Sequence, residues 1–379
     1  MARALESLFK SYYRRTSIPP PPMVESREFG FQFFDSQSML RHLAFSSGEE
    51  LNRFLRERVP RHAYYSTALY EHPSAPDMSE KGWRGAEVVF DIDIDHVYTP
   101  CKDLHDSWKC LDCGAEGRGA PLKCPACGSE KLERSNWVCN LCINAAREEI
   151  LKLLDFLELD FGISRKEMRV YFSGHRGFHL HVESEDVLPL EQDVRRELSD
   201  YVRGLGLDPE TLLKRTRSGK YSLRYGVDAP GWPGRIAKYV ALILAEDPSS
   251  RGGTPPELPL GAWKELISRA VDELGVKIDE KVTIDTRRLI RLPWTLHGKT
   301  GLRVVEFSVG ELEAFTAEDL LGKAIVFSQE ETRVRMPKRP KRVLFYELEE
   351  DGEVIRVPFY LAVYLHANGG AEIIDWRPG

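Results

Sequence analysis

All seven cysteines of this 379-residue chain lie between Cys101 and Cys142. The amphipathic N-terminus, residues 1–13, lacks the apolar core of a secretion signal, so we expect the thiols in a reducing compartment. Clustered cysteines in such a compartment favour a metal over disulfides. Because residues 97–142 also lack apolar periodicity, the sequence predicts a zinc-binding insertion that interrupts the rest of the fold.

Two Cys-x-x-Cys pairs in the insertion, at 110–113 and 124–127, have the spacing of a zinc ribbon. A glycine follows each pair and lets the backbone turn back, so that its NH groups face the thiolate sulfurs. The two pairs supply the four ligands of one predicted zinc site: Cys110, Cys113, Cys124 and Cys127.

A second possible set of zinc ligands lies outside the ribbon. It offers three sulfurs and one imidazole, from Cys101, His105, Cys139 and Cys142. The ribbon would bring these outer residues together at its base, which predicts two nested sites. The alternative is one zinc with spare cysteines. Either zinc would be structural, since four protein ligands leave no open position.

A short apolar run at 87–95 leads into carboxylates at every second position. Its β-branched and aromatic residues predict a buried strand, in which side chains alternate between two faces. Asp91 and Asp93 then share one face, while Ile92 and Ile94 face the core. Two close carboxylates repel each other unless a cation lies between them, and oxygen ligands suit Mg²⁺ or Mn²⁺. The alternative is a strand end where both acids meet solvent.

A glycine-rich turn with one hydroxyl and one arginine lies between two predicted strands, 168–172 and 178–182. Arginine offers a planar fork for phosphate oxygens, and backbone NH groups at the turn add donors. His179 and His181 follow on the polar face of the second strand, and His181 is the weaker candidate. A polar segment at 278–301 adds an acid and further cations, which suit a two-metal site and a triphosphate. Taken alone, that segment would be an ordinary polar loop.

The overall composition is that of a soluble globular protein, with 42% hydrophobic and 30% charged residues. No apolar run approaches the roughly 20 residues that a membrane helix needs, so we expect a cytoplasmic protein without membrane contact. The net charge of −6 does not indicate a nucleic-acid partner. It does not exclude one, because a basic patch can lie on an acidic protein.

The pattern of elements predicts an α/β (α+β) fold with a mixed sheet. Helices are expected over 1–17, 48–58, 145–159, 191–204 and 261–274. Strands are expected over 27–33, 64–70, 86–94, 168–172, 178–182, 289–292, 302–308 and 343–347. The stretch 205–260 is expected to be mixed. We expect three parts: a catalytic core from 1–96, 143–187 and 276–379, the zinc insertion 97–142, and a mainly helical subdomain 188–275.

Together these motifs resemble a known family. The chain is similar to the small, catalytic subunit of archaeal and eukaryotic DNA primase, and fits the archaeal members better. The resemblance rests on six segments in chain order: Arg27–Phe31, Tyr65–Glu71, Val89–Asp93, Ser173–His179, Leu289–Pro293 and Leu296–Gly301.

The resemblance implies a role for each matched residue. The catalytic metal ligands would be Asp91, Asp93 and Asp279, with Asp285 as a rival for the third position. The nucleotide would be bound by Ser173, His175, Arg176, His179, Arg291 and His297. His175 stands where eukaryotic members often carry arginine. The family's zinc motif is similar to the outer ligand set, and the ribbon at 110–127 would be an insertion.

The activity that the resemblance implies is template-directed synthesis of short primers on single-stranded DNA by two-metal nucleotidyl transfer. The cofactors would be two Mg²⁺ or Mn²⁺ ions and structural Zn²⁺. NTPs would be the substrates, with dNTPs left open. The partners would be a primase large subunit, forming a heterodimer, and other replication proteins at an archaeal nucleoid.

Three alternatives remain at this point. A repair-type primase-polymerase shares the fold, but such proteins usually lack this zinc stem. A non-catalytic zinc-ribbon subunit that binds nucleic acid would have lost a catalytic acid, and here all are present. A metal-dependent phosphoesterase could use paired acids but would not need the triphosphate cations.

Overall fold

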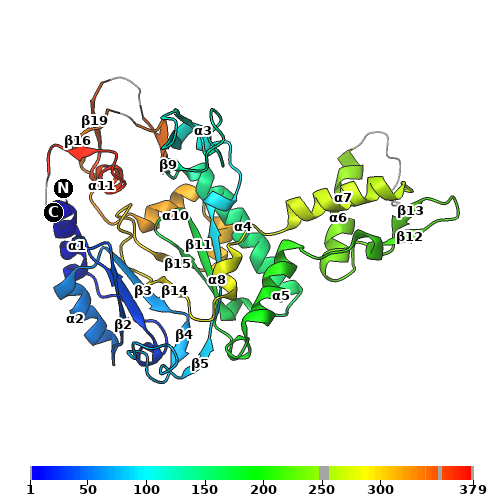
Figure 1. The fold of residues 1–379 in the computed structure, drawn as a ribbon, viewed down its shortest axis with the longest axis horizontal. Coiled ribbons are helices and arrows are strands. Elements are labelled where there is room, and N and C mark those ends of the chain that lie inside the picture. The colour runs from blue at the N-terminus through cyan, green and yellow to red at the C-terminus, as the bar shows by residue number, and fades with distance from the viewer. Residues whose placement is uncertain (1, 247–255, 338, 349–351, 377–379) are drawn as a thin grey trace.

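The computed structural model describes residues 2–246, 256–337, 339–348 and 352–376. It is a mixed α+β structure in which two antiparallel four-stranded sheets form the body (Figure 1). None of the helices in these ranges has the length and apolarity needed to cross a bilayer. The helices are α1 (Ala2–Arg15), α2 (Gly48–Arg58), α3 (Lys102–His105), α4 (Asn140–Leu159), α5 (Gln192–Arg203), α6 (Gly231–Glu246), α7 (Leu260–Leu274), α8 (Glu280–Ile284), α9 (Val309–Ala314), α10 (Ala317–Ala324) and α11 (Phe359–Ala367).

The first body sheet has the order β15–β10–β11–β6. Its strands are β15 (Val305–Phe307), β10 (Met168–Phe172), β11 (Gly177–Val182) and β6 (Val88–Asp93). The register places Asp91 opposite His179 and Asp93 opposite Gly177. A Cβ atom on Gly177 would lie 1.8 Å from the carbonyl oxygen of Ile92, so only glycine allows this approach. The pairing therefore holds the acidic strand end against the glycine-rich turn.

The second body sheet has the order β14–β3–β1–β2. Its strands are β14 (Leu289–Arg291), β3 (His62–Ser66), β1 (Phe29–Gln32) and β2 (Met39–Leu43). Helices α1 and α2 pack against each other beside it, and Ser47 caps α2 by accepting a hydrogen bond from the Glu50 amide. Pairing of β14 with β3 sets Arg291 opposite Tyr64. A small hairpin, β4 (Ala68–Tyr70) and β5 (Trp83–Ala86), connects the two sheets along the chain.

The insertion forms a sheet of its own, in the order β8–β7–β9. Its strands are β7 (Ser107–Cys110), β8 (Glu116–Arg118) and β9 (Leu132–Ser135). Helix α4 begins at Asn140, earlier than the predicted 145. The predicted start was wrong because the apolar periodicity that indicated the helix begins after its first turn. That first turn contains the zinc-ligand candidate Cys142.

The C-terminal part packs against the base of the insertion. It contains the sheet β19–β16–β20 and the hairpin β17–β18, with the strands β16 (Glu331–Arg335), β17 (Arg342–Val343), β18 (Tyr346–Glu347), β19 (Val354–Pro358) and β20 (Glu372–Ile373). The hydroxyl of Tyr364 on α11 accepts a hydrogen bond from the Val138 amide at 3.1 Å, and the Leu344 amide donates to the Val138 carbonyl. This part thus fixes the place where the chain leaves the insertion.

Residues between α5 and α8 form an arm that projects to one side of the body (Figure 1). It contains α6, α7 and the hairpin of β12 (Leu213–Arg215) with β13 (Tyr221–Leu223). Helix α5 instead packs against α8. The stretch 205–260 is mixed, as predicted, because it holds both this hairpin and α6, a helix of 16 residues. Its Gly231-Trp232-Pro233 start resembles a turn, yet proline is compatible with the first turn of a helix.

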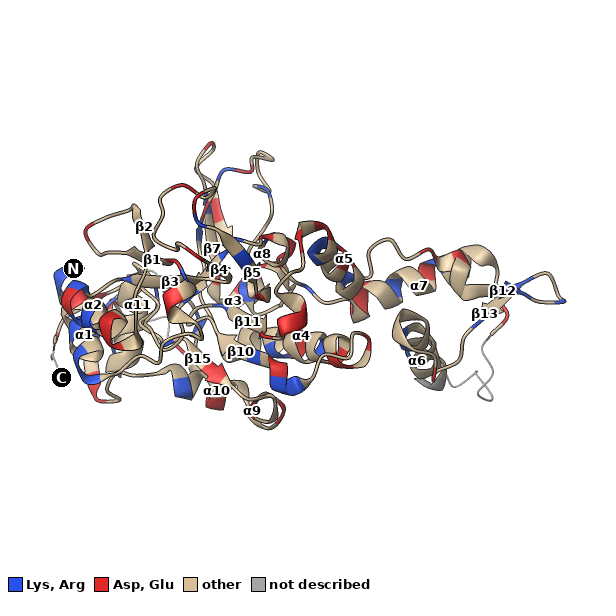
Figure 2. Cartoon of the chain, turned by 90° about the horizontal axis from the view of Figure 1, so that it is seen from below, with Lys and Arg blue, Asp and Glu red and all other residues tan. Residues whose placement is uncertain are grey.

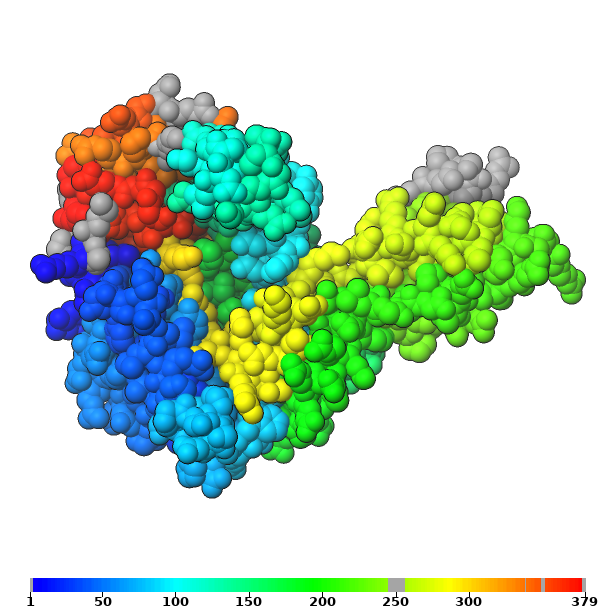
Figure 3. Space-filling model, in the orientation of Figure 1, coloured from blue at the N-terminus to red at the C-terminus, as the bar shows by residue number. Residues whose placement is uncertain are grey.

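The space-filling view shows a hollow on the surface of the body (Figure 3). The N-terminal segment, the insertion and the yellow segment at about residue 290 border it.

Candidate active site and metal sites

Three predicted carboxylates converge at the end of β6. Asp91 and Asp93 share its polar face, and Ile92 between them is fully buried. Asp279 caps the start of α8, and its amide donates a 2.8 Å hydrogen bond to the Asp91 carbonyl. Asp285 lies at the other end of α8, where it accepts a hydrogen bond from the Arg287 amide. The structure therefore places Asp279, and not its rival, beside the pair.

The negative charges of the acids raise one another's pKa. The pKa of Asp91 is raised to about 7, mainly by burial and further by the charges of Asp93 and Asp279. Burial and the charge of Asp95 likewise raise the pKa of Asp93. A donor set made only of carboxylate oxygens, with negative charges close to one another, fits Mg²⁺ or Mn²⁺.

A cluster of imidazoles lies on the adjoining β3 and on the loops after β10 and β14. The rings of His175 and His297 stack with centroids 4.7 Å apart, and His62 meets His297 edge-on at 5.0 Å. Burial lowers the pKa of His62 to about 2 and that of His175 to about 3, helped by nearby cations. Burial and Arg291 also hold the pKa of His297 well below its usual range. The imidazoles are therefore neutral, and the positive charge of this region resides on arginine and lysine.

Arg291 joins this cluster to β3. Its Nη1 lies 2.6 Å from Nδ1 of His62, and its guanidinium lies over the Tyr64 ring at 4.6 Å. Arg288 lies close enough to lower the pKa of Asp91. Sequence reasoning missed three residues, namely His62, Tyr64 and Arg288. Alternation along β3, with His62 and Tyr64 on the face opposite buried Ala63 and Tyr65, was the pattern that could have identified the first two.

The two histidines of β11 differ in their surroundings. His179 Nε2 lies 3.6 Å from Asp91 Oδ1, and burial lowers the pKa of His179 well below its usual range. His181 instead contacts buried Glu87 at 3.0 Å and stacks on Tyr65. His181 shares a face of β11 with His179, but it lies opposite Val89, further along β6 from the turn than Asp91.

Ser173 and Arg176 organise the turn between β10 and β11. The Ser173 hydroxyl accepts a hydrogen bond from the His175 amide at 3.3 Å. The guanidinium of Arg176 is buried; it donates to the carbonyl of Trp137 at 2.7 Å and contacts Asp106 and Asp95 at 3.2 and 3.0 Å. Its Nε has no partner among the described residues. Contact of Ser173 and Arg176 with a nucleotide stays a prediction.

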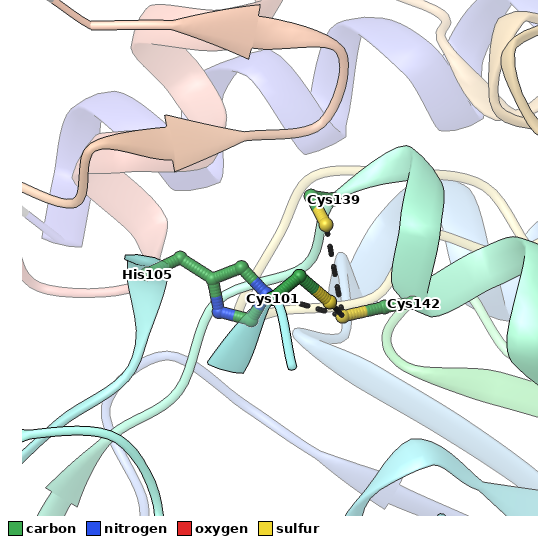
Figure 4. Close-up of side chains that lie close together, drawn as sticks. All are labelled: Cys101, His105, Cys139 and Cys142. Carbon is green, nitrogen blue, oxygen red and sulfur yellow. Dashed lines mark hydrogen bonds between the residues drawn. The ribbon is translucent and has the colours of Figure 1, made fainter. Parts of the chain in front are cut away.

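Both predicted sets of zinc ligands are brought together. In the outer set, Cys101, His105, Cys139 and Cys142 are all buried, and their ligand atoms lie within 4.8 Å of one another. Figure 4 shows the four side chains pointing toward a common centre. Three thiolates and one imidazole in this arrangement match the ligands of a structural zinc.

The inner set lies at the other end of the insertion. The ligand atoms of Cys110, Cys113, Cys124 and Cys127 also lie within 4.8 Å of one another. The glycines after the two pairs both have φ of +74°, which confirms the expected backbone turns. The Cys113 amide, in the turn, helps to lower the pKa of Cys110 to about 7. The arrangement therefore fits a second structural zinc and argues against spare cysteines.

Zinc analysis of the purified chain should find about two ions, since each set offers four ligands. Replacing Cys127, an exposed ligand of the inner set, with serine should reduce the content to about one while leaving the body folded. One zinc in the unmodified chain, or two in the Cys127→Ser variant, would contradict the inner site.

Asp106 connects the outer set to the glycine-rich turn. It is 1% exposed, and its Oδ1 lies 2.7 Å from Nδ1 of the ligand His105. The same carboxylate accepts from the Trp137 amide at 2.9 Å and contacts Arg176. Burial alone would raise the pKa of Asp106, but the His105 hydrogen bond and the charge of Arg176 lower it. One buried acid thus orients a metal ligand and a residue of the turn together.

Comparison of the sequence with known proteins identifies a family. The family model described as "DNA primase small subunit" matches residues 128–309. The protein named DNA primase small subunit PriS from Methanothrix thermoacetophila is 35% identical, over 97% of this chain and 98% of its own length. The proteins of that name from Thermoplasma volcanium and Pyrobaculum calidifontis are 34% and 36% identical. Both alignments cover 98% of this chain, with 97% of the Thermoplasma and 99% of the Pyrobaculum protein. The chain belongs to the DNA primase small subunit family.

Proposed function

We propose that this chain is the catalytic subunit of a DNA primase and extends primers on single-stranded DNA by nucleotidyl transfer, as a DNA-directed RNA polymerase of the class EC 2.7.7.-. The observation that carries the proposal is the convergence of Asp91, Asp93 and Asp279 next to a cluster of cations and neutral imidazoles. A phosphoesterase would need the acids alone, whereas a nucleoside triphosphate explains both groups.

The three acids would hold two Mg²⁺ or Mn²⁺ ions. When bound, such ions lower the pKa of a primer 3′-hydroxyl and neutralise charge on the leaving pyrophosphate. The chain itself contributes rigidity, because β6 and α8 fix the acids through the hydrogen bond from the Asp279 amide to the Asp91 carbonyl. His179 lies against Asp91 and, being neutral, adds no further charge to the site.

The triphosphate would be bound by the residues around the stacked imidazoles. Arg291 supplies a planar fork of donors, and Tyr64 and His62 hold that fork in place. Neutral His175 and His297 can each donate one hydrogen bond and accept another. Ser173, Arg176 and His179 complete the proposed contacts.

The same proposal covers the partners and the division of the chain. A primase large subunit would form a heterodimer with this chain and help to bind the template, and other replication proteins would act with it. The segments 1–96, 143–187 and 276–379 would form the catalytic core, with 97–142 as the zinc insertion and 188–275 as a helical subdomain. The body sheets and the separate sheet of the insertion support this division.

The test is primer synthesis by the purified heterodimer on unprimed single-stranded DNA, with ribonucleotides and deoxyribonucleotides supplied separately. Products of defined length that require Mg²⁺ or Mn²⁺ would support the proposal. Binding of DNA without any synthesis under either condition would favour a non-catalytic subunit. Extension restricted to pre-annealed primers would favour a repair-type polymerase.

A further inference from the structure

The hairpin at the end of the arm carries an unusual concentration of positive charge. Residues 211–227 contain five cations and no acid, in a chain whose net charge is −6. The cations are Lys214, Arg215, Arg217, Lys220 and Arg224, and all five are exposed. We call residues 213–225 the cationic hairpin.

The cations of the cationic hairpin are not neutralised by neighbouring acids. Elsewhere on the surface, arginines pair with carboxylates, as Arg165 does with Glu158 and Glu313. Within the described ranges, none of the five forms an ion pair. Glu257, which lies near the turn, accepts a hydrogen bond from the Ser218 hydroxyl at 2.5 Å. The hairpin therefore presents a local positive potential on an otherwise acidic protein.

The cationic hairpin is held in a defined conformation. Leu213 and Leu223 pair across the two strands and are both buried. The carbonyl of Tyr221 accepts a 2.8 Å hydrogen bond from the Trp263 indole of α7, and Arg224 Nη2 donates to the Leu213 carbonyl at 3.2 Å. A ligand that binds here meets ordered backbone, so association costs little conformational entropy of the chain.

The location of the hairpin separates it from the acids of β6. Figures 1 and 2 show β12 and β13 at the outer end of the arm, with blue cationic segments at its tip. Such a position suits contact with a long, uniformly charged ligand that extends beyond the reaction site. Tyr225, 43% exposed, lies next to Arg224 and adds an aromatic ring on which a base could stack.

We propose that the cationic hairpin binds the phosphate backbone of nucleic acid at a distance from the catalytic acids. This inference rests on the proposed function, because that function makes nucleic acid the substrate. Lysine and arginine around a polar turn are typical of phosphate contacts, whereas the core of a protein interface is depleted in lysine. The net charge of −6 for the whole chain gives no indication of this local cationic surface.

The test compares two variants with equal loss of charge. The first combines Lys214→Gln, Arg215→Gln, Arg217→Gln and Lys220→Gln, and retains Arg224 because it fastens the two strands. The control combines Arg3→Gln, Lys10→Gln, Arg14→Gln and Arg15→Gln on the exposed face of α1. Anisotropy of labelled single-stranded DNA, without NTPs, measures Kd for the heterodimer at several salt concentrations.

The hairpin variant is expected to bind about 10-fold or more weakly at low salt. Its dependence of log K on log salt should become shallower by about 0.7 for each phosphate that the variant no longer neutralises. An unchanged Kd and slope, or an equal weakening in the control, would overturn the proposal. So would unchanged DNA binding with weakened assembly of the heterodimer, which would assign the hairpin to a protein partner. Because the assay needs no synthesis, failure of the proposed function would not obscure its result.

Discussion

Replacing Asp91 with asparagine is expected to abolish primer synthesis and, at the same time, to stabilise the metal-free protein. Activity should fall by about 10³-fold or more, because the variant loses a ligand that the metals need. Stability should rise because burial and the charges of Asp93 and Asp279 disfavour the ionised form of Asp91 more than Arg288 and Arg291 favour it, as its raised pKa of about 7 indicates. A residue that merely supported the fold would show the opposite change in stability.

The pH dependence of that stabilisation follows from the direction of the shift. The folded protein binds a proton at Asp91 up to about pH 7, whereas the unfolded chain releases it near the ordinary aspartate pKa of 3.8. The charge therefore costs nothing below about pH 4, costs more as the pH rises, and reaches its full cost above about pH 7. Asp91→Asn should then be more stable by up to about 4 kcal/mol at pH 8 and equally stable near pH 4.

Thermal unfolding with and without Mn²⁺ measures both effects. Unmodified protein should be stabilised by Mn²⁺ at pH 8, and the variant should lose most of that response. Asp77→Asn is the matched control, since the Ser79 amide lowers the pKa of that exposed acid. Retained synthesis, or destabilisation at pH 8 equal to that of a core mutation, would contradict the metal site.

Asp279 and Asp285 provide a second comparison at the same site. Asp279→Asn should also abolish synthesis, whereas Asp285→Asn at the other end of α8 should retain it. If Asp285→Asn abolished synthesis and Asp279→Asn retained it, Asp285 would be the third ligand. That result would contradict the assignment of Asp279, which rests on its position at the start of α8.

Features that depend on nearby residues could be predicted from the sequence. Helix α2 begins and ends as predicted, because its cap and its apolar period are local. Alternation along β6 placed Asp91 and Asp93 on one face for the same reason. Helix α11 could not be predicted in this way, since residues 359–366 are all buried and therefore show no amphipathic period.

The parts of the site that could not be predicted depend on contacts between distant segments. His62 lies 229 residues from Arg291 in the sequence, and only the pairing of β3 with β14 brings them together. The Arg176 motif indicated phosphate binding, but no local pattern shows that Asp106 of the insertion contacts the same guanidinium. Tertiary contacts of this kind determine whether a cation in a motif is free, paired or shared.

The second large effect is expected at Asp106. Asp106→Ala should lower the free energy of unfolding by about 3–5 kcal/mol, because it leaves the buried charge of Arg176 with only the half-exposed Asp95 as a partner. The variant should also bind zinc about 10–100-fold more weakly at the outer site, since His105 loses the acceptor that orients its ring. Denaturant unfolding and competition with a zinc chelator measure these two quantities separately.

Two further variants separate the role of Asp106 from a general loss of packing. Asp95→Ala removes the other carboxylate that contacts Arg176, and because its side chain is 47% exposed it should cost only about 0–1 kcal/mol. Asp106→Asn keeps the shape and a hydrogen-bond acceptor, so it should retain the fold and most of the zinc while weakening the hold on Arg176. If Asp106→Ala matched Asp95→Ala in stability and kept full zinc affinity, the carboxylate would not connect the two sites. If Asp106→Asn lost as much stability and zinc affinity as Asp106→Ala, the shape of the side chain and its acceptor oxygen would not be enough to connect the two sites. The buried negative charge of Asp106 would then be the property that connects them.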